Sequence, residues 1–177
     1  MSEPLRLFLA VYPPSELKPA LSRLAVGLQQ DCGGRPVAPE ALHLTLAFLG
    51  DTAAERLPAL QAALAALKFA PFTLCLARLA RWDNGVVWLG LAQDSPALAE
   101  LAQAVRTALE QAGLGFDRKR FTPHLTLLRR SVRAVPATVT AAFEWTVRDF
   151  ALVQSQPGQA GSSYRDLARF AASAAGD

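Results

Sequence analysis

Hydrophobic side chains recur along the chain at two spacings, which predict strands and helices respectively. Residues 5–12 form an apolar run closed by Pro13-Pro14, as expected for a buried strand. Residues 14–31 repeat leucine at helical spacing, and Gly33-Gly34 marks the end of that helix. Residues 42–49 alternate between large apolar side chains and others, which predicts a strand with one buried face.

The middle of the chain predicts a helix followed by a hairpin. The helix opens with a Thr-x-x-Glu capping box and continues over residues 52–67, a stretch rich in alanine and leucine. Residues 71–80 and 86–92 predict two strands. The sequence Asp-Asn-Gly at 83–85 joins them and is typical of a hairpin turn.

The last third of the chain predicts one more helix and at least two more strands. Ser95 followed by Pro96 is typical of a helix start, and Gly113 is the expected stop. Residues 124–129 predict a strand, and residues 142–154 predict at least one more.

Interleaved helices and hairpin-linked strands favour an α+β fold with mostly antiparallel sheets. A helix precedes each of the strands at 42–49 and 124–129, and these two strands share a local pattern, which indicates internal duplication. No linker separates two folding units. We therefore expect residues 1–177 to form a single domain with two lobes.

Composition narrows the class of protein. Hydrophobic residues make up 51% and charged residues 19% of the chain, as expected for a folded domain with a large core. The net charge is +3, and six of the 18 basic residues fall between Arg118 and Arg133. This stretch is either a solvated surface or a phosphate-binding rim, and His124 lies inside it.

The sequence does not support a metal-binding or other cofactor-dependent protein, a secreted protein or a membrane protein. Cys32 and Cys75 form no CxxC and no metal-ligand spacing, and the chain has no Walker loop, Rossmann fingerprint or HExxH, so no metal or other cofactor is expected. The amino terminus lacks the pattern of a signal peptide, and apolar runs are too short to span a membrane. We expect a soluble cytoplasmic protein, and nothing indicates more than a monomer.

The strongest signal is a repeated tetrapeptide. The chain has two histidines, and each begins the sequence His-Leu-Thr-Leu, at 43–46 and at 124–127. Because residues i and i+2 of a strand point to the same face, His43 and Thr45 present an imidazole and a hydroxyl together, as do His124 and Thr126. The leucines anchor the opposite face in the core.

Two such strands facing one another would suit chemistry at phosphorus. Entering and leaving oxygens lie roughly in line, so one base and one acid are needed on opposite sides. Histidine serves either role near neutral pH, and threonine hydroxyls donate hydrogen bonds to phosphoryl oxygens. Structural histidines are one alternative. A two-histidine metal site is another, but it lacks a third ligand with recognisable spacing.

These residues resemble the 2H phosphoesterase superfamily, and specifically the RNA 2′,3′-cyclic phosphodiesterases, first described as 2′–5′ RNA ligases. The resemblance covers nearly the whole chain. It rests on residues 6–11 (RLFLAV), 39–50 (PEALHLTLAFLG), 121–129 (FTPHLTLLR) and 152–155 (LVQS), followed by Gly161 and Tyr164.

The resemblance implies a two-lobed α+β fold with a central cleft between the histidine strands. It also implies metal-independent hydrolysis of a 2′,3′-cyclic phosphate at an RNA end to a 2′-phosphomonoester, with reverse 2′–5′ ligation as a secondary reaction. By the same resemblance, His43 is the proton donor, His124 is the proton acceptor, and Thr45 and Thr126 hold the phosphate. Spacing alone leaves open which histidine is the acid.

Further candidates follow from strand alternation. Alternation places Arg130 on the His124 face, where it either binds phosphate or is a surface arginine. Phe48 falls on the leucine face, which favours a place in the core over base stacking unless a bulge intervenes. Tyr164 either lines the cleft or packs. Trp82 and Trp88 are expected in the core or at its rim.

Two other functions remain open at this point. One keeps the chemistry and changes the substrate to a small cyclic nucleotide or an ADP-ribose cyclic phosphate. The other is an RNA-binding module without catalysis, against which the intact histidines and threonines argue.

Overall fold

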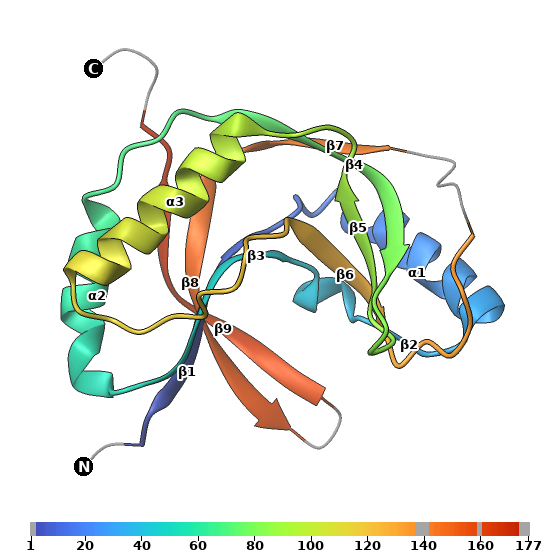
Figure 1. The fold of residues 1–177 in the computed structure, drawn as a ribbon, viewed down its shortest axis with the longest axis horizontal. Helices are drawn as coiled ribbons and strands as arrows, with labels where there is room; N and C mark the ends of the chain where they lie inside the picture. Colours follow the sequence, from blue (N-terminus) through green and yellow to red (C-terminus); the bar gives the residue numbers. More distant parts are fainter. Residues whose placement is uncertain (1–2, 137–141, 159–160, 174–177) are drawn as a thin grey trace.

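Across the residues that the computed structural model describes (3–136, 142–158 and 161–173), nine strands form one antiparallel sheet. The strand order is β7-β4-β5-β6-β3-β1-β8-β9, with the short β2 beside β6. The sheet curls into a half-barrel (Figure 1). The strands are β1 (Leu5–Val11), β2 (Arg35–Pro36), β3 (Leu44–Thr52), β4 (Phe72–Arg81), β5 (Val87–Leu91), β6 (His124–Arg129), β7 (Phe143–Val147), β8 (Asp149–Gly158) and β9 (Gly161–Ala171).

Three α-helices pack against this sheet in the described part of the chain. They are α1 (Lys18–Cys32), α2 (Leu57–Ala65) and α3 (Pro96–Gln111). Helices α2 and α3 lie together on one side of the molecule, and α1 lies on the other (Figure 1). The expected α+β class with antiparallel strands is confirmed, and the two expected lobes are halves of one continuous sheet.

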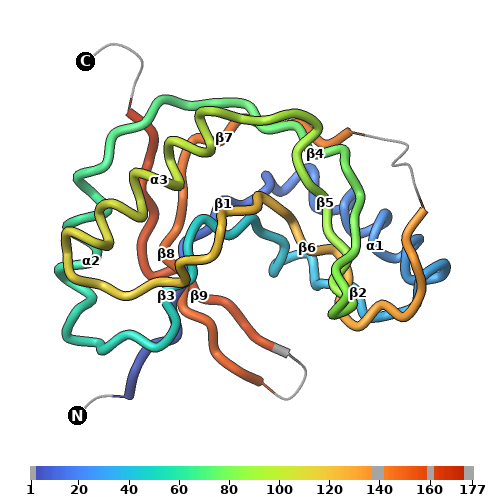
Figure 2. Tube along the Cα trace, in the orientation of Figure 1, coloured from blue at the N-terminus to red at the C-terminus, as the bar shows by residue number. Residues whose placement is uncertain are grey.

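The two halves repeat one arrangement, as the shared local pattern of the two histidine strands indicated. In each half a strand, a helix and a second strand follow one another, as β1-α1-β3 and as β5-α3-β6. Helix α1 packs against β6, and helix α3 packs against β3, so each helix covers a strand of the other half. The trace in Figure 2 shows β3 and β6 meeting at the middle of the sheet. The helices therefore fix the two halves relative to one another.

The leucines of both tetrapeptides lie in the main core. Leu44, Leu46, Leu125 and Leu127 are each at most 1% exposed. Shortening a buried leucine to alanine typically costs about 2–5 kcal/mol of stability. These leucines hold the two histidine strands in place.

The helix expected over residues 52–67 begins later than its capping box indicates. Strand β3 continues to Thr52, which pairs with Leu5 of β1 and is only 8% exposed. A short 3-10 turn, Ala54–Arg56, then leads into α2 at Leu57. Pairing with β1 satisfies the backbone of Thr52 and buries its side chain, and this outweighs the local preference for a cap.

Helix α1 also starts late, at Lys18, because residues 15–17 form a turn. Strand β9 is an element that the hydrophobic pattern did not predict. It pairs with β8 at one end of the sheet, and all of its exposed positions except Ala171 carry polar side chains, so it lacks a continuous apolar run.

Other expected elements are confirmed. The Asp-Asn-Gly turn joins β4 to β5, with Gly85 at a φ of 82°. The Ser95 hydroxyl caps α3 by accepting a hydrogen bond from the Leu98 amide at 3.3 Å. The apolar run around Cys75 predicts a buried free thiol there, but Cys75 is free and only half-buried, and Cys32 is the buried free thiol. In the part of the chain that the structure describes, every helix is too short or too polar to cross a membrane.

Candidate active site

The two tetrapeptides meet at the centre of the sheet. Leu44 of β3 pairs with Leu125 of β6 in antiparallel register. Extending that register by one residue in each direction places His43 opposite Thr126, and Thr45 opposite His124. All four side chains therefore share the sheet face opposite to the leucines, with each histidine facing the threonine of the other half.

Both imidazoles are oriented by the same hydrogen bond. Nδ1 of His43 lies 2.7 Å from the carbonyl oxygen of Ala41, and Nδ1 of His124 lies 2.7 Å from that of Thr122. Because a carbonyl only accepts hydrogen bonds, Nδ1 carries the proton in each ring. Nε2 of each neutral imidazole is therefore left with its lone pair, ready to accept a proton.

Aromatic side chains from neighbouring strands contact each imidazole. The rings of Phe8 and Tyr164 have centroids 4.8 Å and 5.2 Å from that of His43. Those of Trp82 and Trp88 lie 4.6 Å and 6.0 Å from His124. The contacts with Trp82 and Trp88 place these residues beside a candidate catalytic group, and Trp88 is also buried, at 5% exposure.

Burial and nearby positive charge keep both histidines neutral in the free protein. The pKa of His43 is lowered to about 4, mainly by burial and to a lesser extent by the charges of Arg129 and His124, against an opposing effect of the Ala41 hydrogen bond. Burial is also the main cause that lowers the pKa of His124, with Arg129 contributing. The register of β3 and β6 places both imidazoles on one face of the sheet, so they border a common space, which His43 lines directly.

That space is a pocket of about 600 Å³, a size that suits a nucleotide. His43, Thr45, Thr126 and Tyr164 line it, as do the buried Ser155 and the ring of Phe8. Four arginines surround it: Arg6, Arg35, Arg129 and Arg130. A pocket with this many guanidinium groups favours an anionic ligand.

Two side chains occupy positions that strand alternation did not predict. Phe48 lines the pocket, so its expected place in the core is wrong. The pairing of β3 with β1 slips at Leu46, because Ala10 pairs with Thr45 and Leu9 pairs with Ala47. Such a bulge reverses the faces of the residues that follow it, which brings Phe48 to the His43 side, before a second slip at Leu49.

An equivalent slip places Arg129 on the His124 face. Trp88 pairs with Thr126 and Val87 pairs with Leu128, so Leu127 is the extra residue. Arg130 also lines the pocket, but it follows the end of β6 with a φ of 60° and does not continue the strand, so the alternation argument for its position is wrong.

Sequence reasoning overlooked Phe8 and assigned no clear place to Arg6. Phe8 is 3% exposed within an apolar run, so nothing in the sequence distinguishes it from the core. Arg6 faces the pocket, with its guanidinium carbon 5.1 Å from the centre of the Phe48 ring. The described residues contain no group of three or more His, Cys, Asp or Glu side chains placed to hold a metal ion.

Known proteins share this arrangement over nearly the full chain. The profile of the 2′-5′ RNA ligase superfamily matches residues 13–159. The RNA 2′,3′-cyclic phosphodiesterase of Escherichia coli is 36% identical, with 97% of this chain and 98% of that protein covered. The Thermus thermophilus protein of the same name is 38% identical, covering 94% and 89%. The crystal structure of E. coli LigT complexed with 3′-AMP superposes with a TM-score of 0.87 at 35% identity, covering 96% of this chain and 99% of that one.

Proposed function

Because the chain belongs to the 2′-5′ RNA ligase superfamily, we propose that it hydrolyses 2′,3′-cyclic phosphates at RNA ends to 2′-phosphomonoesters. The observation that carries this proposal is the pairing of Leu44 with Leu125. It gathers two imidazoles and two hydroxyls on one face beside the Arg129 guanidinium. Relatives that share almost the full length of the chain bear the name RNA 2′,3′-cyclic phosphodiesterase.

In this reaction the two histidines move protons on opposite sides of phosphorus. Nε2 of His124 accepts a proton from water as the water oxygen bonds to phosphorus. The bond from phosphorus to the 3′ oxygen breaks, and His43 donates a proton to that oxygen. The 2′ oxygen keeps its bond, which leaves a 2′-phosphomonoester, and solvent restores the two protonation states.

The remaining polar groups stabilise the phosphoryl group. Hydroxyls of Thr45 and Thr126 donate hydrogen bonds to its non-bridging oxygens, and Arg129 offsets their charge. Arg130 and Tyr164 complete the substrate contacts. Since His43 is neutral in the free protein, the anionic substrate must raise its pKa before it can donate a proton.

We infer the following setting for the reaction. The protein acts as a cytoplasmic monomer whose residues 1–177 work as one bilobal domain. It needs no metal or other cofactor, because histidines supply the proton transfers and arginines the positive charge. Its partners are RNA ends or oligonucleotides with a 2′,3′-cyclic phosphate, and joining of RNA ends through a 2′–5′ bond is the reverse reaction.

The test is hydrolysis of an oligonucleotide with a 2′,3′-cyclic phosphate end in excess EDTA. We expect full conversion to the 2′-phosphomonoester, identified by mass and by comparison with an authentic standard. No hydrolysis, or hydrolysis that EDTA abolishes, would rule the proposal out. The double variant His43→Ala/His124→Ala is the control for contaminating nucleases. A cyclic mononucleotide and an ADP-ribose cyclic phosphate, assayed in parallel, separate RNA ends from the smaller substrates.

A further inference from the structure

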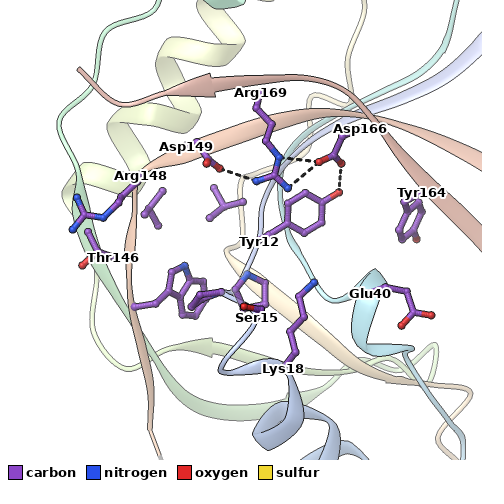
Figure 3. A pocket seen from close by; sticks show the side chains of 15 residues that line it. Tyr12, Ser15, Lys18, Glu40, Thr146, Arg148, Asp149, Tyr164, Asp166 and Arg169 are labelled. Carbon is purple, nitrogen blue, oxygen red and sulfur yellow. Dashed lines mark hydrogen bonds and ion pairs between the residues drawn. The ribbon is translucent and has the colours of Figure 1, made fainter. Parts of the chain in front are cut away.

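A second pocket, of about 550 Å³, lies directly beside the catalytic pocket. Tyr164 of β9 lines both pockets, and its ring contacts His43, so the second pocket begins one side chain away from the catalytic centre. Figure 3 shows this pocket between Tyr12, which follows β1, Lys18 at the start of α1, residues 145–149 of β7 and the start of β8, and strand β9.

One wall of this second pocket is held by a fixed polar network. The Tyr12 hydroxyl donates a hydrogen bond to Asp166 at 2.9 Å. Arg169 forms ion pairs with Asp166 at 2.9 Å and with Asp149 at 3.4 Å. Both carboxylates are thus engaged, as the dashed lines in Figure 3 show, and Arg169 offsets one of their two negative charges.

Positive charge remains on the other sides. Among the described residues, neither Lys18 nor Arg148 forms an ion pair with a carboxylate, and both line the pocket. The Lys18 ammonium lies 5.9 Å from the centre of the Tyr12 ring. Glu40 is the one lining acid outside the Arg169 network. The cations of Lys18 and Arg148 thus line a pocket together with the Tyr12 ring, Pro13 and Pro14. Positive charge beside an aromatic surface suits the phosphate and base of a nucleotide.

The covalent connectivity of the ribose indicates which part of an RNA substrate can reach the second pocket. In a 2′,3′-cyclic phosphate end, C3′ is bonded to C4′, which carries the 5′ phosphodiester and the rest of the RNA. C2′ is bonded to C1′, which carries the base. With the 3′ oxygen beside His43, the C4′ edge of the ribose is fewer bonds from that oxygen than the C1′ edge that carries the base. Because the Tyr164 ring contacts His43 and also lines the second pocket, an RNA chain that leaves past Tyr164 enters this pocket.

We propose that the second pocket binds the nucleotide immediately 5′ of the terminal nucleotide that carries the cyclic phosphate. Lys18 contacts the phosphodiester that joins the two nucleotides. This inference rests on the proposed function, because it takes His43 as the group beside the 3′ oxygen. Its consequence is that a dinucleotide is a better substrate than a mononucleotide, since only the longer substrate fills both pockets.

The test compares kcat/KM for a cyclic mononucleotide and for a dinucleotide that ends in the same cyclic nucleotide. The variant Lys18→Met keeps most of the side-chain stem and removes the charge, and Lys68→Met is the matched control at an exposed lysine outside both pockets. We expect Lys18→Met to lower kcat/KM for the dinucleotide about tenfold, as for one lost charge-assisted contact, and to leave the mononucleotide unchanged within about twofold. Lys68→Met should change neither.

Two results would contradict the proposal that the second pocket binds a nucleotide. One is equal kcat/KM for both substrates in the unaltered protein, and the other is an equal loss for both in Lys18→Met. Failure of the proposed function gives a different result, because neither substrate would then be hydrolysed. In that case, titration of a dinucleotide with a terminal 2′-phosphate still tests the site, with binding about tenfold weaker in Lys18→Met expected.

Discussion

Phe48 and Arg129 occupy corresponding positions in the two halves of the sheet. Each lies five residues after a histidine, and each reaches the catalytic pocket because its strand gains one extra residue after the threonine of the motif. The two halves therefore share a β-bulge at the same position but place different side chains in the pocket. One half supplies an apolar ring beside the phosphate site, and the other half supplies a permanent positive charge.

The charge of Arg129 sets the pH dependence of the reaction. Turnover needs one histidine protonated and one neutral, so kcat/KM follows a bell-shaped profile. Because both histidine pKa values in the free protein lie below 6.5, we expect the maximum below pH 6.5. Removing a positive charge favours the protonated imidazoles and raises both pKa values, so Arg129→Gln should move the maximum to higher pH.

The measurement is kcat/KM between pH 4 and pH 9 for the unaltered protein, Arg129→Gln and Arg130→Gln. Arg129→Gln should also lower the maximal kcat/KM about 10- to 100-fold, as one charged hydrogen bond is lost. Arg130→Gln is the matched control, because Arg130 lines the same pocket without lowering either histidine pKa. A profile that stays in place in Arg129→Gln would contradict the electrostatic role of this residue.

Removal of either imidazole should abolish most turnover and preserve the fold. A positioned proton-transfer group contributes about 10² to 10⁴-fold in rate, so His43→Ala and His124→Ala should each lose that much kcat. His43 lines the pocket, and both imidazoles lie on the sheet face opposite to the core leucines, so we expect thermal melting temperatures close to that of the unaltered protein. Near-normal rates in either variant would refute the acid–base roles, and strong destabilisation would instead indicate a structural histidine.

His43 should also make the folded protein sensitive to acid. Its pKa is about 4 when folded against 6.5 as the reference, so the unfolded chain binds the proton more tightly. The stability that His43 gives by staying neutral is present above about pH 6.5 and is lost as the pH falls toward 4. At 1.36 kcal/mol for each pKa unit, the loss by pH 4 is about 3 kcal/mol.

Urea unfolding at pH 7 and pH 4 measures this effect. Carboxylates also titrate over this range, so the relevant quantity is the difference between the unaltered protein and His43→Gln. We expect the free energy of unfolding to fall less in His43→Gln, by up to about 3 kcal/mol. Equal losses in both proteins would mean that His43 titrates normally in the folded state.

Gly90 leaves the space that the Trp88 ring needs beside His124. Gly90 pairs with His124 across β5 and β6, and a Cβ at Gly90 would lie 2.6 Å from the Trp88 ring. Gly90→Ala should therefore displace the ring, cost about 1–3 kcal/mol of stability and lower kcat. Gly27→Ala is the control, since its Cβ would meet open space in α1 and alanine favours helix. Unchanged stability and rate in Gly90→Ala would show that Trp88 adjusts freely.

Local sequence determined a large part of this protein. The shared face of His43 and Thr45, that of His124 and Thr126, and the buried leucines between them follow from the two-residue period of a strand. The same holds for the hairpin at Gly85 and the cap of α3 at Ser95, because a turn or a cap depends only on a few adjacent residues.

Tertiary structure decided everything that depends on a partner strand. The extra residues at Leu46 and Leu127 arise in pairing with β1 and β5, so alternation along one strand misplaced Phe48 and missed Arg129. Thr52 stayed in β3 because Leu5 pairs with it. The second pocket depends on Tyr12 and Lys18, which are close in the sequence, meeting Asp166, which lies 154 residues after Tyr12. Local periodicity carries no information about strand register or long-range contact, since both are set by packing between distant segments.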